Sequence, residues 1–179
     1  KSMLKINITD DVRQYANNQV TIKNFGNRSA GFNGSKEKQY TGVLGECVVH
    51  QMLDRELPTY QDGNLLEDLV INDLTVDVKT MARNVDMQDN YVHNFVGYQK
   101  DRECDVLLFN SINKKTREAQ ICGWLPKKEF LDILRFIYKK KHDFMFIDTQ
   151  LPDDQQIHKN FNQLIIRSPN ITDYSLDQD

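Results

Sequence analysis

Residues Leu65 to Met81 read LLEDLVINDLTVDVKTM, and the predicted fold is built around this stretch. Two apolar runs rich in β-branched residues flank Asn72-Asp73, a dipeptide that tolerates positive φ angles, so the pattern predicts a β-hairpin. If Asn72 and Asp73 form the loop, Ile71 faces Leu74 and the pairing continues outward one residue at a time. A four-residue loop keeps this register, whereas a three-residue loop would shift it.

The predicted register gathers charged side chains on one face of the hairpin. Asp68 faces Asp77, and Lys79 shares the face of Asp77 because side chains two residues apart in a strand point the same way. Opposed like charges destabilise a sheet, and a divalent cation would remove that repulsion. Mg²⁺ is typically held by one or two carboxylates, waters and substrate phosphates. The pattern therefore indicates a Mg²⁺ site at Asp68 and Asp77, with Glu67 pointing to the other face.

Lys79 gives this patch a second chemical function. An ammonium group beside a bound metal can position or activate water, or stabilise charge on a phosphate. A structural alternative stays open, because an Asp/Lys pair on the solvated face of a sheet is common.

The hairpin is preceded by a predicted helix over residues 36–55, where apolar residues recur at helical spacing. Gly42 and Gly45 lower its helix propensity. Close approach of the helix to the hairpin would explain both glycines, and it would bring Glu46 to the acidic patch. A protein without chemistry has no need to hold three carboxylates together, which favours a catalytic interpretation.

Glu46 on a helix, Asp68 on a strand and Asp77-Val78-Lys79 on the next strand resemble the PD-(D/E)XK nuclease superfamily, which has a restriction-endonuclease-like fold. The Gly-x-x-Gly-Glu run that ends at Glu46 matches as well. The segment 121–130 is similar to segments of phage and restriction-type members. The resemblance covers about residues 38 to 130.

Two departures from the family pattern leave less to match. Glu67, rather than proline, precedes Asp68. Asp77 stands where many members carry glutamate.

The resemblance implies Mg²⁺-dependent hydrolysis of phosphodiester bonds in DNA, with Mn²⁺ as a substitute and endonuclease action favoured. Asp68, Asp77 and the Val78 carbonyl would bind the metal, and Glu46 would bind a second metal or orient water. Lys79 would stabilise the attacking hydroxide or the developing charge. A junction-specific nuclease, an exonuclease, an RNA substrate and a non-catalytic nucleic-acid-binding or assembly protein on the same fold remain open alternatives.

The rest of the chain predicts an α/β fold, with a mixed sheet of about four or five strands flanked by helices. Further strands are expected over residues 3–9, 91–99, 105–111, 119–125 and 144–147. Helices are expected from Asp11 and from Pro126, and a polar loop over 81–90. One globular domain is expected, with an N-terminal helix and arm (1–35), a nuclease core (36–150) and a C-terminal extension (151–179).

Several side chains outside the acidic patch are candidate DNA contacts. Basic groups bind phosphates through interactions that weaken with salt, and a histidine and a glutamine on the predicted strand 91–99 would lie near the site. The candidates are Arg28, Lys36, Lys38, Arg83, His93, Gln99, Lys114, Lys115 and Arg117.

Composition sets few limits on the partner. The net charge of −3 over 179 residues is unusual for a DNA-binding protein, but local basic patches decide phosphate binding. No apolar run approaches the roughly 20 residues of a membrane span. Three cysteines without zinc-like spacing, and no signal-peptide pattern, favour a cytoplasmic protein, in the host cell if phage-encoded. A restriction-like enzyme would form a homodimer to cut both strands, although the sequence shows no dimer surface.

Overall fold

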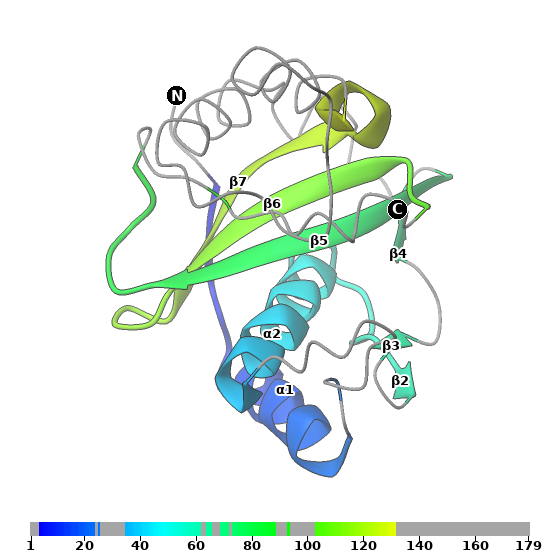
Figure 1. Cartoon of the computed structure of the whole chain (residues 1–179). Helices are drawn as coiled ribbons and strands as arrows, with labels where there is room; N and C mark the ends of the chain where they lie inside the picture. Colours follow the sequence, from blue (N-terminus) through cyan, green and yellow to red (C-terminus); the bar gives the residue numbers. More distant parts are fainter. Residues whose placement is uncertain are drawn as a thin grey trace.

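A mixed sheet of five strands, in the order β1-β7-β6-β5-β4, forms the centre of the protein (Figure 1). The computed structural model describes residues 4–23, 25, 35–61, 64–65, 69–71, 73–88, 93 and 103–131. The strands are β1 (Leu4–Asn7), β4 (Leu69–Ile71), β5 (Leu74–Arg83), β6 (Val106–Asn113) and β7 (Glu118–Pro126). β5 and β6 are parallel, and the other neighbours are antiparallel. A separate two-stranded ladder joins β2 (Tyr60–Gln61) to β3 (Asn64–Leu65). The predicted α/β class and mixed sheet are confirmed.

The hairpin of β4 and β5 has the predicted register. Ile71 pairs with Leu74 and Leu69 pairs with Val76. Asp73 has a φ of 65°, the left-handed conformation expected of a tight hairpin loop. Residues 66–68, which include Asp68, lie outside the described residues.

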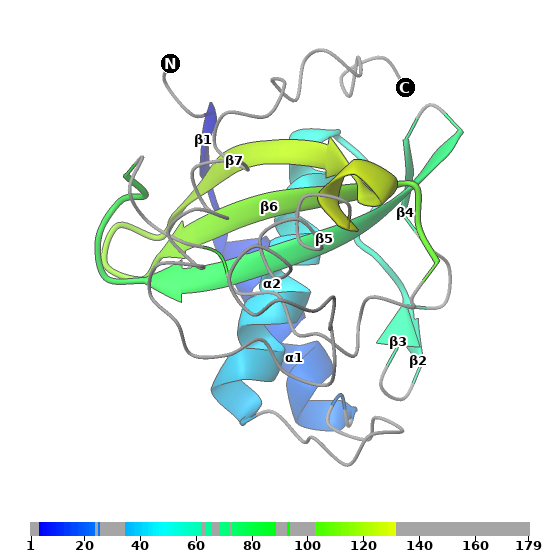
Figure 2. The ribbon, with the colours of Figure 1, turned by 45° about the horizontal axis from the view of Figure 1, so that its top comes forward.

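Two helices cover one face of the sheet. α1 (Asp10–Ile22) begins after Thr9, whose side chain accepts a hydrogen bond from the Val12 N–H, and α2 (Lys36–Met52) begins after Ser35. α2 lies directly against the sheet, and α1 packs beside α2 on the same side (Figures 1 and 2). Within the described residues, neither helix is long and apolar enough to cross a membrane.

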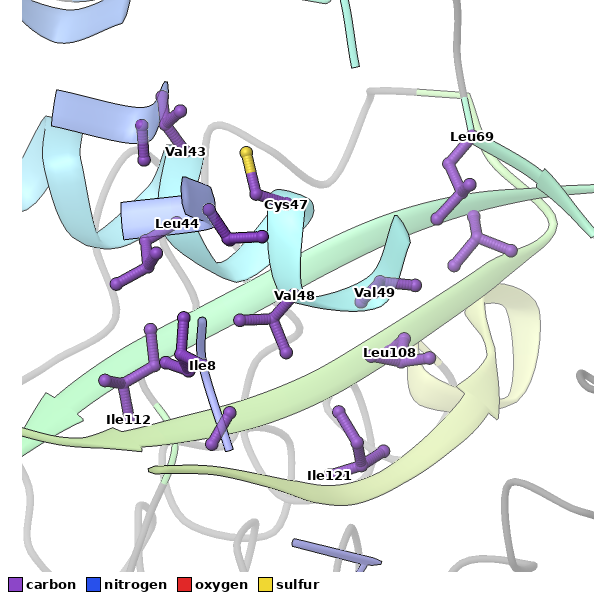
Figure 3. Packing of buried hydrophobic residues seen from close by; sticks show 14 of the residues in the cluster. Ile8, Val43, Leu44, Cys47, Val48, Val49, Leu69, Leu108, Ile112 and Ile121 are labelled. Atoms are coloured by element: carbon purple, nitrogen blue, oxygen red, sulfur yellow. The ribbon is translucent and has the colours of Figure 1, made fainter. Parts of the chain in front are cut away.

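The main hydrophobic core lies between α2 and the sheet. Val48 and Val49 of α2 are fully buried and face Leu108 of β6 and Ile121 of β7 (Figure 3). Each strand contributes every second side chain to this core, since alternate residues of a strand point to opposite faces. On β5 these are Val76 and Val78.

α2 approaches β5 closely at Gly45. A Cβ atom built on Gly45 would lie 1.8 Å from the Thr80 Oγ1 atom. The Asn110 side chain of β6 also donates a 3.2 Å hydrogen bond to the Gly45 carbonyl. The prediction of close approach is thus confirmed at Gly45. It is wrong at Gly42, where a Cβ would meet nothing within 4 Å.

Part of the predicted loop over 81–90 is strand. β5 continues through Arg83, because its second half pairs with β6 residue by residue up to Arg83 and Asn113. Sequence periodicity did not reveal this pairing, which joins segments separated by the crossover 84–105. The predicted strands 91–99 and 144–147 lie outside the described residues, apart from His93.

The last described part of the chain follows the prediction closely. Residues 114–117 form a basic turn between the two predicted strands, and β7 returns antiparallel to β6. β7 carries an extra residue opposite Phe109 and Asn110, and Gly123 at this irregularity has a φ of 151°. Helical structure begins at Lys127, directly after Pro126.

Candidate active site

Asp77 and Lys79 form an ion pair on β5. The Lys79 Nζ atom lies 2.8 Å from Asp77 Oδ2, and the side chains are only 12% and 7% exposed for Lys79 and Asp77, respectively. The two residues therefore share a face of the strand, as predicted from their spacing. Removing one partner from such a buried pair leaves an uncompensated charge, which is strongly destabilising.

This pair lies on the face of the sheet opposite α2. Gly45 of α2 contacts the Thr80 side chain, so even-numbered residues of this part of β5 face the helix. Asp77 and Lys79 have the opposite parity and leave β5 on the other face. Phe109 of β6 is the strand neighbour of Lys79 on that face.

The Val78 carbonyl, predicted as a metal ligand, points toward the β4 side of β5. The Thr75 carbonyl accepts a 3.0 Å hydrogen bond from the Asp105 N–H, and the Arg83 carbonyl accepts one of 2.8 Å from the Lys114 N–H, both on the β6 side. Because successive carbonyls alternate between the two edges of a strand, the Val78 carbonyl faces the other edge. The predicted position of Asp68 lies on that side, one register step beyond the described pairing of Leu69 with Val76.

Glu46 is held by a tyrosine in the α2 layer. The Tyr60 hydroxyl donates a 2.6 Å hydrogen bond to Glu46 Oε2, and Tyr60 is itself buried with its ring edge-on to Phe25. Burial raises the pKa of Tyr60, and the Glu46 carboxylate raises it further, so the phenol stays protonated and donates. Sequence reasoning missed Tyr60, because no local motif links residues 14 positions apart.

Glu46 and the Asp77–Lys79 pair are positioned by different elements, α2 and β5. Glu46 belongs to the helix on one face of the sheet, whereas the pair lies on the other. Within the described residues, no group of three or more His, Cys, Asp and Glu side chains is arranged to hold a metal ion. Asp68 is outside that set, so the two-carboxylate site stays a prediction.

Asp105 is a second residue that the sequence analysis missed. Its carboxylate accepts hydrogen bonds of 2.8 Å from the Thr75 N–H and 3.0 Å from the Thr75 hydroxyl. Its carbonyl accepts one of 3.0 Å from the Lys127 N–H, where the next helix begins. Asp105 thus fixes the start of β6 beside Thr75, which lies two residues before Asp77 on β5. The available signal was an aspartate at the start of a strongly apolar run.

The predicted DNA contacts have different surroundings. Lys38, Lys115 and Arg117 are exposed, and Lys114 pairs with Glu37 at 3.4 Å. Lys36 instead donates a 2.6 Å hydrogen bond to the Val20 carbonyl in the last turn of α1. A lysine there compensates the partial negative charge at the end of a helix.

The other four predicted contacts are either shielded from solvent or outside the described residues. Arg83 is half-buried at the end of β5, and its guanidinium contacts the Met81 sulfur at 3.5 Å. His93 is 1% exposed. Arg28 and Gln99 lie outside the described residues.

Cys47 has a structural role in the core beneath α2. The side chain is fully buried in the α2 core. Burial raises the pKa of its thiol to about 12, so it stays protonated and is a poor nucleophile.

His93 is a neutral imidazole in an apolar setting. Its ring packs 5.3 Å from that of Phe109, and within the described residues neither ring nitrogen has a hydrogen-bond partner. Burial, assisted by the nearby Arg83 charge, lowers the pKa of His93 to about 3.

Acid should destabilise the fold through His93. Below pH 6.5 the unfolded chain binds a proton that folded His93 does not, so stability falls as the pH drops toward 3. Between pH 7 and pH 5 this amounts to about 2 kcal/mol. His93→Phe keeps an aromatic ring against Phe109. Its free energy of unfolding, measured with urea at both pH values, should therefore fall by about 2 kcal/mol less than that of the wild type. His50, whose pKa is also lowered by burial, is present in both proteins and cancels. Equal losses in the two proteins would contradict the assignment.

Comparison with known proteins does not assign this chain to a family. No protein-family model matches this chain, and no curated protein or solved structure is significantly similar to it.

Proposed function

We propose that this protein is a Mg²⁺-dependent deoxyribonuclease of restriction-endonuclease-like fold that cuts within DNA. The observation that carries the proposal is the ion pair of Asp77 and Lys79, which lies on a strand whose hairpin register is the predicted one. The sequence predicts that Asp68 lies opposite Asp77, one step beyond the pairing of Leu69 with Val76. The spacing of Asp77 and Lys79 is that of the (D/E)XK motif, which the resemblance assigns to metal binding and catalysis.

The donor chemistry near Asp77 suits a hard divalent cation. The Asp77 carboxylate and the Val78 carbonyl are oxygen donors, and the predicted second carboxylate is Asp68. When bound there, Mg²⁺ or Mn²⁺ would polarise the phosphate and lower the pKa of a water ligand. Lys79 would hold positive charge on the same face, where it can contact a phosphate oxygen or orient the attacking water.

Glu46 has a less direct place in the proposal. Tyr60 fixes its carboxylate in the α2 layer. To orient water or bind a second ion, Glu46 would have to reach the β4-side edge of β5, toward which the Val78 carbonyl points. Its contribution to cleavage is therefore proposed to be smaller than that of Asp77 or Lys79.

The basic turn between β6 and β7 supports DNA binding at a distance from the cleavage chemistry. Lys114 follows Asn113, the strand partner of Arg83, which is four residues beyond Lys79 on β5. At roughly 3.3 Å per residue the turn begins about 13 Å from Lys79. The exposed Lys115 and Arg117 would contact the DNA backbone there and make binding sensitive to salt.

Cleavage of supercoiled plasmid tests the proposal. The protein should nick or linearise the circle with Mg²⁺ or Mn²⁺ and leave it intact with EDTA. A closed circle has no ends, so cutting it identifies an endonuclease, whereas degradation of linear DNA alone would identify an exonuclease. Failure to cut linear, circular, branched and single-stranded DNA with either metal would overturn the assignment of a deoxyribonuclease.

The alternative of a non-catalytic nucleic-acid-binding protein is favoured by one specific observation. Asp77 and Lys79 neutralise each other and are nearly buried, as expected of a structural ion pair. Such a protein would bind DNA with the same affinity in Mg²⁺ and in EDTA and would not cut it.

A further inference from the structure

We propose that Lys79 is a latch on the metal site: it occupies the Asp77 carboxylate when no metal is bound, and a divalent cation must displace it. This inference rests on the proposed function, because it assigns a regulatory role to the same site. Metal binding would thus do two things at once. It would neutralise Asp77 and release the Lys79 ammonium to contact a phosphate.

The geometry of the pair is the first argument. The 2.8 Å contact between Lys79 Nζ and Asp77 Oδ2 places a full positive charge where a cation bound to that carboxylate would also lie. Both side chains are almost excluded from solvent, so water screens little of the repulsion between two cations held there. The ammonium and the metal therefore compete for Asp77.

The covalent arrangement of the strand is the second argument. Lys79 is two residues from Asp77 on the same face, so the pair forms without any rearrangement of the backbone. The lysine side chain has a flexible stem of four carbons, so its ammonium group can leave the carboxylate while β5 stays paired with β6. The latch can open by side-chain rotation alone.

Competition has a consequence for substrate binding. A DNA phosphate that attracts the Lys79 ammonium away from Asp77 would strengthen metal binding, and the metal would by reciprocity strengthen DNA binding. Metal-free protein would hold its catalytic lysine in a neutral pair, and both partners would be released together when metal and phosphate arrive.

Calorimetric titration of Mn²⁺ into DNA-free protein tests the latch. Lys79→Met removes the competing ammonium and keeps the length of the side chain, so its dissociation constant for Mn²⁺ should be at least tenfold lower than that of the wild type. Lys5→Met is the matched control. It breaks another lysine–aspartate pair, the 2.7 Å contact of Lys5 with Asp86, and should leave Mn²⁺ affinity unchanged.

Thermal unfolding with and without Mn²⁺ separates the latch from a merely structural pair. Without metal, Lys79→Met should melt below the wild type, because the buried Asp77 carboxylate loses the ammonium group paired with it. Mn²⁺ should then raise its melting temperature more than that of the wild type, since a tighter ligand stabilises the native state more. Equal shifts in the two proteins would overturn the latch.

A measurement on the wild type covers the case in which Lys79→Met does not fold. The ammonium resonance of Lys79 in ¹H–¹⁵N spectra should shift when Mg²⁺ is added, and that of Lys5 should not. An unmoved Lys79 signal, with Mg²⁺ binding seen by calorimetry, would refute the latch and leave the proposed function intact. Absence of any Mg²⁺ or Mn²⁺ binding to either protein would instead remove the metal site on which both proposals depend.

Discussion

Asp77→Asn is expected to reduce the rate of Mg²⁺-dependent plasmid cleavage on the order of a thousandfold, and Lys79→Ala by a similar factor. The amide keeps the size of the carboxylate but loses the negative charge that binds a divalent cation. The alanine loses the ammonium group that lies 2.8 Å from the Asp77 carboxylate. Removing a single group that stabilises developing charge in a water-excluded site typically slows a reaction by 10²–10³-fold, and losing the metal ligand adds to that.

Asp86→Asn is the control for Asp77→Asn. Asp86 is also paired with a lysine, Lys5, but its side chain is much more exposed, and it lies three residues beyond the end of β5. This variant should cut plasmid at the wild-type rate when purified in the same way, which excludes a contaminating nuclease. Circular dichroism and thermal unfolding would establish that each variant is folded at the assay temperature. Cleavage by Asp77→Asn at the wild-type rate would show that the site lies elsewhere.

The hairpin register could be predicted because its determinants are local. A two-residue loop that tolerates positive φ fixes the pairing of Ile71 with Leu74, and strand alternation then places Asp77 and Lys79 together. The N-caps Thr9 and Ser35 are local in the same sense. Interactions within a few residues leave a readable pattern in one sequence.

The parallel pairing of β5 with β6 could not be predicted, because it depends on long-range contacts. The last three residues of β5, Met81 to Arg83, begin a stretch that looks polar and loop-like in isolation, yet they pair fully with β6. The hydrogen bond from Tyr60 to Glu46 is likewise set by the packing of α2 against the chain that follows it. Neither has a sequence signature of its own.

The position of α2 relative to Asp77 was predictable in principle. An apolar helix stripe packs on the apolar face of a strand, and on β5 that face carries Val76 and Val78. The acidic residue between them must then lie on the opposite face from the helix. The predicted approach of the helix to the hairpin did not take into account which face of the sheet the helix covers.

Gly45→Ala is expected to destabilise the fold by about 2 kcal/mol. The added Cβ would lie 1.8, 2.6 and 2.8 Å from the three side-chain atoms of Thr80, closer than any real contact. Overpacking of this kind typically costs about 1–3 kcal/mol, from which the better helix propensity of alanine subtracts a little. Gly45 also accepts the Asn110 hydrogen bond, so α2 cannot withdraw from β5 without losing it.

Gly42→Ala makes the same chemical change one turn earlier in the same helix, but it should stabilise the fold. A Cβ at Gly42 meets nothing within 4 Å, so the variant should gain about 0.8–1 kcal/mol of helix propensity. Urea unfolding of the two variants and of Thr80→Ala combined with Gly45→Ala would complete the test. Thr80→Ala removes two of the three clashing atoms, so the double variant should be more stable than the sum of the single effects predicts. If Gly45→Ala is as stable as Gly42→Ala, α2 does not approach β5 as closely as described, and Glu46 is placed differently with respect to the sheet.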